Sequence, residues 1–287
     1  MYCEFYGFSE KPFTITPNPR FIFLSSNHRE ALAHLVYGID THAGFIAMTG
    51  EVGTGKTTLL RALLSQLEPE KYRSALIFNP CLTGEQLLAA ICREFCLESD
   101  GKDSFAYLDA LNRFLLEQHT VGRTVALVID EAQNLAPDVL EQLRMISNLE
   151  TEQAKLIQII LAGQPELDDL LERHDLRQLS QRITVRCRLT PMGLDDTGEY
   201  IRHRLKISGC HFPGFFSRRA VKKIYRFSQG IPRLINVVCE QALVLAWTRE
   251  SPVVGSSIVS QVIAASRRDF GRTGWLQRFI VWLCAGK

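Results

Sequence analysis

The chain has 287 residues, enough for one large domain or two modest ones, and its 46% hydrophobic and 22% charged residues are ordinary for a globular protein. The first residues lack a basic segment followed by an apolar one, which argues against a secretory signal, and no repeat or low-complexity stretch occurs. Eight cysteines without a C-x-x-C pair predict reduced thiols in a cytosolic protein and argue against a zinc site.

Charge is distributed unevenly along the chain. Residues 1–176 carry 14 basic and 25 acidic side chains, a net charge of −11, and residues 177–233 carry 13 basic and 3 acidic ones, a net charge of +10. The whole chain carries only +2. This polarity suits an acidic partner, such as nucleic acid or an anionic surface, or head-to-tail contact between copies of the same protein.

The N-terminal residues 1–30 are expected to form an arm ahead of the first domain. Its Pro-Asn-Pro stretch at 17–19 cannot be helical, and the Ser-Ser-Asn group at 25–27 offers an N-cap to a helix that begins near His28. The first domain is therefore expected to start at residue 31.

An α/β domain is predicted for residues 31–190. Helix-period segments such as 57–67 and 84–97 separate short apolar runs that are typical of buried strands. Apolar strands that alternate with helices predict a parallel sheet with helices on both faces. The five expected strands are 45–49, 74–79, 124–130, 155–163 and 184–189.

Beyond Pro191 the strand-like runs stop, which places a domain boundary near residue 190. Glycine and proline residues break the following stretch into amphipathic segments with the helical period. A helical domain is therefore predicted for residues 191–270, followed by an amphipathic C-terminal tail at 271–287. The expected helices lie within 195–209, 217–229, 231–250 and 256–270.

A phosphate-binding loop is predicted where the first strand meets the next helix, in the sequence GEVGTGKTT. Glycines let backbone N–H groups point at phosphate oxygens, and the helix presents its positive N-terminal end to the same anion. Lys56 would reach the β- and γ-phosphates, and the Thr57 hydroxyl would ligate Mg²⁺. The expected nucleotide-binding residues are Gly50, Glu51, Val52, Gly53, Thr54, Gly55, Lys56, Thr57 and Thr58.

The run TVALVIDEAQ supplies the carboxylates that such a loop requires. Asp130 would help to hold Mg²⁺ through its water shell, and Glu131 would polarise a water for attack on the γ-phosphate. Two surface acids closing a strand are the alternative, but the apolar residues before Asp130 favour a buried strand whose end faces the ligand. Asn79, which ends another run, would either hold Glu131 away from water or cap the next helix.

These motifs resemble those of an AAA+ ATPase of the general secretion pathway protein A (ExeA-like) family. Relatives of that family include ATPases associated with pili, with exopolysaccharide or exosortase loci, and with the regulation of transposition. The resemblance covers residues 1–270, and it rests on the following segments: YGFSEKPFTITPNPRFIFLSSNHREALAHLVYGI, GEVGTGKTTLLRALL, VIDEAQNL, ILAGQPEL, LRQLSQRI and GIPRLIN.

The resemblance implies further roles in ATP hydrolysis. Gln164 would be the sensor-1 residue, and Arg233 in GIPRLIN would be the sensor-2 residue that lowers a helical lid onto the nucleotide. Arg182 would be an arginine finger that reaches the γ-phosphate of a neighbouring subunit, with Arg177 as the competing candidate. A finger that acts between subunits implies a ring or filament, so hydrolysis would require self-association.

The resemblance therefore implies an oligomerising, Mg²⁺-dependent ATPase that drives assembly of a secretion, pilus or polysaccharide-export system. Its expected partners are other copies of the chain and envelope or secretion machinery proteins. The alternative is an ATP-gated DNA-binding scaffold of the transposition-regulator type, favoured by the basic residues 177–233. The apolar run in the tail is too short to cross a bilayer, so the tail is expected at a membrane interface, on the lid or on a partner. The expected location is the cytoplasm or the cytoplasmic face of the inner membrane.

Overall fold

The computed structural model describes residues 2–15, 18–78, 81–150, 155–210, 212 and 214–269, and these form two compact units. The sheet unit comprises residues 28–51 and 56–190. The described residues of the helical unit lie within 1–27, 52–55 and 191–287. Each unit is therefore assembled from segments that are separated along the chain.

A parallel five-stranded sheet forms the centre of the sheet unit, as the alternating pattern predicts. The strand order is β2-β3-β4-β1-β5, so β4 lies between β1 and β3. Every predicted strand is present, although the second one begins and ends two residues earlier than expected. The strands are β1 (Phe45–Gly50), β2 (Tyr72–Ile77), β3 (Thr124–Ile129), β4 (Ile157–Gly163) and β5 (Ile183–Leu189).

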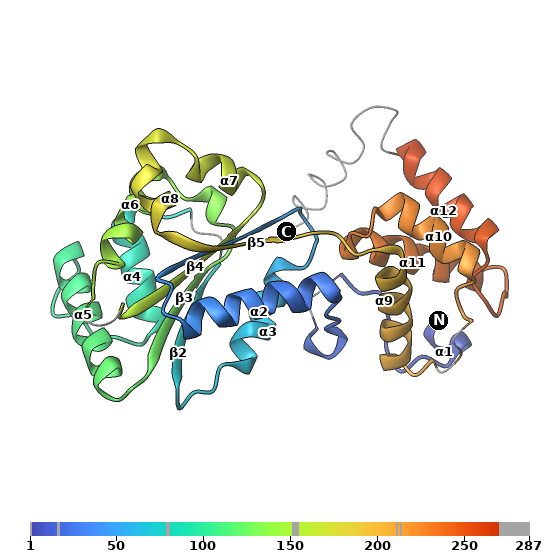
Figure 1. Ribbon diagram of the computed structural model, residues 1–287. Coiled ribbons are helices and arrows are strands. Elements are labelled where there is room, and N and C mark those ends of the chain that lie inside the picture. Colours follow the sequence, from blue (N-terminus) through green and yellow to red (C-terminus); the bar gives the residue numbers. More distant parts are fainter. Residues whose placement is uncertain are drawn as a thin grey trace. The chain divides into compact units, whose positions relative to one another are not determined.

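Helices cover both faces of this sheet (Figure 1). One face carries α2 (Ser26–Asp40) and α3 (Lys56–Gln66), and Gly38 of α2 packs so closely on β1 that a Cβ there would lie 2.6 Å from Ile46. The other face carries α4 (Gly84–Glu94), α5 (Ser104–Thr120) and α6 (Pro137–Ile146). The shorter elements of this unit are η2 (Ala132–Asn134), α7 (Glu166–Leu171), η3 (His174–Leu176) and α8 (Arg177–Arg182).

The strands read as continuous apolar runs because helices bury both of their faces. All residues of β1 and β4 are buried, whereas β2 and β5, at the sheet edges, also contain exposed positions. Alternate residues such as Phe45, Leu127 and Ile159 join the buried side chains of α4, α5 and α6 in one core. This core fixes the carboxyl ends of the strands, where the predicted motifs lie.

Helices make up most of the helical unit, and N-terminal residues complete its core. Tyr2, Phe8 and Phe13 are buried against the C-terminal helices. The predicted arm therefore packs with a segment about 200 residues away along the chain. The elements are α1 (Tyr2–Tyr6), η1 (Pro19–Phe21), α9 (Leu194–Ile207), α10 (Arg218–Ser228), α11 (Pro232–Trp247) and α12 (Ser256–Asp269).

Buried Arg204 of α9 attaches the N-terminal segment to this core. Its guanidinium group donates to the carbonyl oxygens of Pro12 (2.6 Å) and Thr14 (3.2 Å) and to the hydroxyl of Tyr200 (2.8 Å). It also lies over the ring of Phe21, 4.8 Å from the centroid. Charge-assisted hydrogen bonds of this kind hold a segment in place where no regular secondary structure does.

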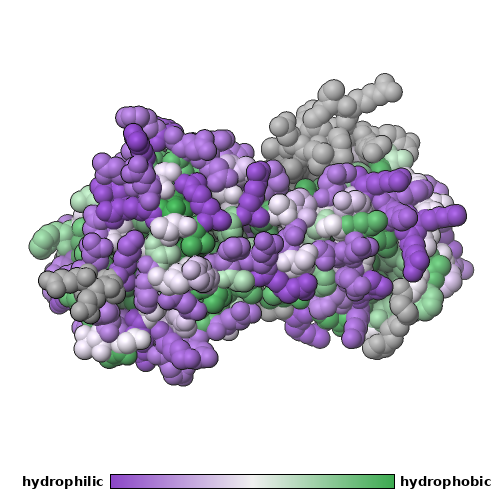
Figure 2. Space-filling view, viewed as in Figure 1, coloured by the Kyte–Doolittle hydropathy of each residue, from purple (hydrophilic) through white to green (hydrophobic). Residues whose placement is uncertain are grey.

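Hydrophilic residues predominate on the face of the molecule shown in Figure 2. Within the described ranges, no helix is long and apolar enough to cross a bilayer. The tail at 271–287, for which a membrane interface was one expected site, lies outside the described residues.

Candidate functional site

The loop between β1 and α3 has a backbone that favours glycine at two positions. Gly53 has φ +81° and Gly55 has φ +102°, in the region that L side chains rarely adopt. Gly53 also lies against the start of α11, where a Cβ would come within 2.9 Å of the Arg233 Cβ. The Arg233 N–H donates to the Gly53 carbonyl at 3.4 Å, so this predicted sensor residue contacts the predicted phosphate loop through its backbone.

Lys56, at the first position of α3, is buried within this loop. Its ammonium group donates to the carbonyl oxygens of Gly50 (2.7 Å) and Glu51 (3.3 Å), which are the first two residues of the motif. Burial lowers the pKa of Lys56, and the carboxylates of Glu131 and Asp130 partly oppose that shift. The loop thus curls around a buried cation, which fits a site for an anionic ligand.

The side chains of Thr57 and Asp130 contact each other next to this loop, although 73 residues separate them along the chain. The Thr57 hydroxyl donates to Asp130 Oδ2 at 2.5 Å, and the backbone N–H of Glu131 donates to Asp130 Oδ1 at 2.9 Å. Burial raises the pKa of Asp130 above its usual value, and these hydrogen bonds only partly oppose the shift. A hydroxyl and a carboxylate side by side are oxygen ligands of the kind that Mg²⁺ prefers, so the pair fits that ion.

Glu131 follows Asp130 in the left-handed conformation, with φ +55°. Its Oε2 accepts hydrogen bonds from the side-chain amides of Gln164 (3.1 Å) and Gln133 (2.7 Å). Gln164 reaches Glu131 because β4 is the neighbour of β3 and both strands end at the same edge. Asn79, which was also considered as a partner of Glu131, lies outside the described residues.

Sequence reasoning missed Gln133. Its side chain connects Glu131 to the end of β4, because its Oε1 also accepts the backbone N–H of Gln164 at 3.0 Å. The available signal was an amide side chain two residues after a candidate catalytic carboxylate. That spacing alone does not predict contact, since it depends on the left-handed turn at Glu131.

The two candidate arginine fingers differ in their surroundings. Arg182, at the end of α8, is half-buried and donates to Ser147 Oγ (3.1 Å) and to Asn148 Oδ1. Arg177, at the start of α8, is exposed, and its side chain forms no hydrogen bond or ion pair within the described part of the chain. Among the described residues no hydrogen bond joins either arginine to Glu131.

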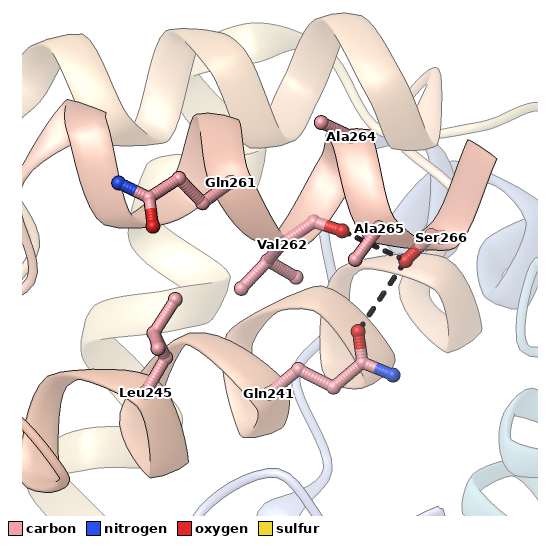
Figure 3. A pocket seen from close by; sticks show the side chains of 7 residues that line it. All are labelled: Gln241, Leu245, Gln261, Val262, Ala264, Ala265 and Ser266. Carbon is pink, nitrogen blue, oxygen red and sulfur yellow. Dashed lines mark hydrogen bonds between the residues drawn. The ribbon is translucent and has the colours of Figure 1, made fainter. Parts of the chain in front are cut away.

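A separate hollow lies in the helical unit between α11 and α12, and Figure 3 shows its lining. Gln241 and Leu245 of α11 face Gln261 and Val262 of α12. Ser266 donates to Gln241 Oε1 at 3.4 Å across one end. Among the described residues that line this hollow, none is a predicted site residue and none is charged.

Comparison with known proteins agrees with this geometry. The profile of the AAA domain family matches residues 39–171. General secretion pathway protein A of Aeromonas hydrophila is 49% identical over 252 residues, which span 88% of this chain and 46% of that protein. The resemblance expected from the motifs is thereby confirmed, and the chain spans about half the length of this relative.

Solved structures show the same fold at low sequence identity. The ORC2 protein of Aeropyrum pernix, in complexes described as ADPNP and ADP, has a TM-score of 0.65 at 17% identity, over 90% of this chain and 72% of that one. Drosophila ORC bound to DNA has a TM-score of 0.62 at 20% identity, over 93% of this chain and 66% of that one. These likenesses confirm a P-loop ATPase fold followed by a helical region.

Replacing Asp130 by Asn should stabilise the nucleotide-free protein. A raised pKa means that the folded state favours the protonated carboxyl group of Asp130. The contribution of this group to stability is therefore fully present below its pKa in the unfolded chain, and it is lost as pH rises through its pKa in the folded protein. Asparagine mimics the neutral form: its oxygen can accept from the Glu131 N–H while its amide group donates to the Thr57 hydroxyl, which can rotate to accept. We expect a Tm above that of the unaltered protein at pH 7.5, measured by calorimetry.

Asp169→Asn, at an exposed position of α7, is the matched control and should change stability by less than about 0.5 kcal/mol. A Tm of Asp130→Asn at or below that of the unaltered protein would contradict the buried-charge interpretation.

Proposed function

Because the chain is an AAA ATPase, we propose that residues 50–58 bind the phosphates of ATP and that Thr57 and Asp130 hold a Mg²⁺ ion with it. The single observation that carries this proposal is the hydrogen bond between the half-buried Thr57 and the buried Asp130 beside the buried Lys56, with Glu131 next in the chain. A buried carboxylate beside a buried ammonium group provides both charges that a metal–phosphate complex requires.

In this proposal Glu131 orients and polarises the water that attacks the γ-phosphate, and Gln164 contributes its amide at the same point. When bound, Mg²⁺ supplies positive charge that offsets the negative charge of the phosphates. Lys56 would exchange its carbonyl partners, Gly50 and Glu51, for phosphate oxygens. The burial of Lys56 strengthens its interaction with an anion, because water screens that interaction little.

We assign the nucleotide-binding domain to residues 31–190 and the helical lid domain to residues 191–270. Arg233 would act as the sensor-2 residue at the start of α11. Its support is the contact between the Arg233 backbone and the Gly53 carbonyl, through which a change in the loop would reach α11. Residues 1–30 would then serve as the arm that completes the lid, since Arg204 binds it.

Glu131→Gln should abolish ATP turnover while preserving ATP binding. The amide keeps the size of the side chain but cannot accept a proton, so we expect a loss of at least about 100-fold in kcat and a change of less than about threefold in Kd. Turnover measured by phosphate release and binding measured with a fluorescent ATP analogue check both parts. Glu117→Gln, an exposed change in α5, is the control, and a Glu131→Gln chain with normal turnover would contradict the assignment.

We further propose that hydrolysis requires self-association in a ring or filament, with Arg182 reaching the neighbouring site. The net charge of −11 on residues 1–176 and +10 on residues 177–233 would favour head-to-tail contact between copies. We propose that this motor, in the cytoplasm or on the cytoplasmic face of the inner membrane, drives assembly of a secretion, pilus or polysaccharide-export system. Of these systems, the name of the relative, General secretion pathway protein A, supports only secretion.

Two inactive chains should restore activity when they are mixed. Arg182→Ala should lower turnover by about 10³-fold, because an arginine finger stabilises the transition-state charge. Mixed with Glu131→Gln, it should recover part of the turnover, since the Arg182 of one chain completes the site of the other. Arg177→Ala is the matched control, and turnover should rise with protein concentration for the unaltered chain.

An inactive Arg177→Ala beside an active Arg182→Ala would transfer the finger role to Arg177. A specific activity that is independent of protein concentration would contradict the requirement for assembly.

A second candidate function, an ATP-gated scaffold on DNA, is favoured by the basic face of α10. The side chains of this face are exposed, and none of them forms an ion pair within the described ranges; they are Arg218, Arg219, Lys222 and Arg226. A row of unneutralised cations suits the phosphates of a nucleic acid. The similar fold of Drosophila ORC has been solved with DNA, which supports this candidate only at the level of the fold.

Removing the charge of this α10 face should weaken any DNA binding and its salt dependence together. Each lost phosphate contact lowers the slope of log K against log salt by about 0.9, so the fourfold alanine variant should lose a slope of up to about 4. Fluorescence anisotropy with a labelled duplex at several salt concentrations measures this. Lys102→Ala, an exposed change in the sheet unit, is the control. Absence of binding, or equal loss in the control, would remove the DNA-scaffold candidate.

A further inference from the structure

We infer that Gln133 is a positioning residue that holds the Glu131 carboxylate and the end of β4 in one arrangement for catalysis. The inference rests on the proposed function, since it takes Glu131 as the group that polarises water. Gln133 Nε2 donates to Glu131 Oε2 at 2.7 Å, and Gln133 Oε1 accepts the Gln164 N–H at 3.0 Å. One side chain therefore joins two residues on neighbouring strand ends.

The backbone after β3 makes this contact reachable. Glu131 has φ +55°, and η2 follows at once, closed by hydrogen bonds from Asn134 N–H to the Glu131 carbonyl and from Leu135 N–H to the Ala132 carbonyl. Residues two apart do not face each other on a regular helix, and on a strand they share a face but stand about 6.6 Å apart. The left-handed residue and the tight turn bring the Gln133 side chain back onto Glu131.

Gly163, the last residue of β4, provides independent support. A Cβ at this position would lie 2.8 Å from Gln133 Oε1, inside the normal contact distance, and would also press on Leu167. The space that the Gln133 amide occupies therefore exists because β4 ends in a residue without a side chain. The turn after β3 and the end of β4 thus both accommodate the Gln133 amide group. A glutamine that only faced solvent would not require this space.

Hydrogen-bond chemistry accounts for the choice of residue. A primary amide offers both a donor and an acceptor at its end, and here the carboxylate of Glu131 takes the donor while a backbone N–H takes the acceptor. Glu131 Oε2 accepts a second bond from the Gln164 amide at 3.1 Å. With one carboxylate oxygen held by two donors, the direction of the other oxygen is restricted, which favours a single geometry for attack.

The bond to Glu131 and the bond to Gln164 can be removed separately. Gln133→Met keeps the length of the side chain and removes both bonds. Gln133→Glu keeps an acceptor for the Gln164 N–H and replaces the neutral donor to Glu131 by a second carboxylate, so that the two acids repel each other or share one proton. Asn134→Ala is the matched control, because Asn134 lies next to Gln133 in η2, is exposed and forms no side-chain hydrogen bond within the described ranges.

We expect both Gln133 variants to lower kcat by about 10- to 100-fold with ATP affinity changed by less than about threefold, and Asn134→Ala to leave both unchanged. Hydrogen exchange of a peptide covering residues 163–167 supplies a readout that is independent of turnover. Exchange at Gln164 should become faster in Gln133→Met and stay slow in Gln133→Glu. All chains are compared at equal protein concentration, with Tm measured to verify folding.

A normal or raised kcat in Gln133→Met would overturn the inference, and a raised value would show that the Gln133 contact restrains Glu131. A loss of ATP affinity equal to the loss of kcat would also overturn it, since that pattern marks general damage to the site. Glu131→Gln distinguishes failure of the proposed function from failure of the positioning role. If that variant hydrolyses ATP normally, the proposed function fails; if it is inactive while Gln133→Met is fully active, only the positioning role fails.

Discussion

The hydrogen bond between Thr57 and Asp130 is the contact on which the rest of the site depends. It joins the start of α3, which follows β1, to the end of β3, and β4 lies between β1 and β3 in the sheet. Because β4 occupies that intermediate position, its last residues must lie beside the pair, and Gln164 does so through Glu131. The strand order thus brings three distant segments to one edge, where ligand sites of parallel α/β sheets are found.

This arrangement is electrostatically costly without a ligand. Lys56 and Asp130 are both buried. Burial lowers the pKa of Lys56 and raises the pKa of Asp130, so it favours the neutral form of each side chain. The sheet unit tolerates these charges because its core of apolar strand and helix residues is extensive. A site that binds charged ligands is expected to reduce the stability of the protein, since its charges are arranged for the ligand.

The helical unit obeys a different constraint, because its core is completed by residues from the opposite end of the chain. Tyr2, Phe8 and Phe13 pack among the C-terminal helices, and Arg204 binds backbone carbonyl groups of the N-terminal segment. Few of these contacts are local in sequence, so the unit depends on long-range packing. The backbone hydrogen bond from Arg233 to Gly53 lies in the same unit.

The sequence by itself determined the sheet and the residues of the phosphate loop, because strand burial on both faces and glycine-rich turns leave direct patterns in the chain. It also indicated Gln164, through a family resemblance. Tertiary structure alone decided what these residues contact: Gln133 reaches Glu131 only because of a left-handed turn, and Gly163 makes room for it only because β4 lies beside β3. The packing of the N-terminal segment against Arg204 was equally hidden, since contacts between residues 190 positions apart have no local signature.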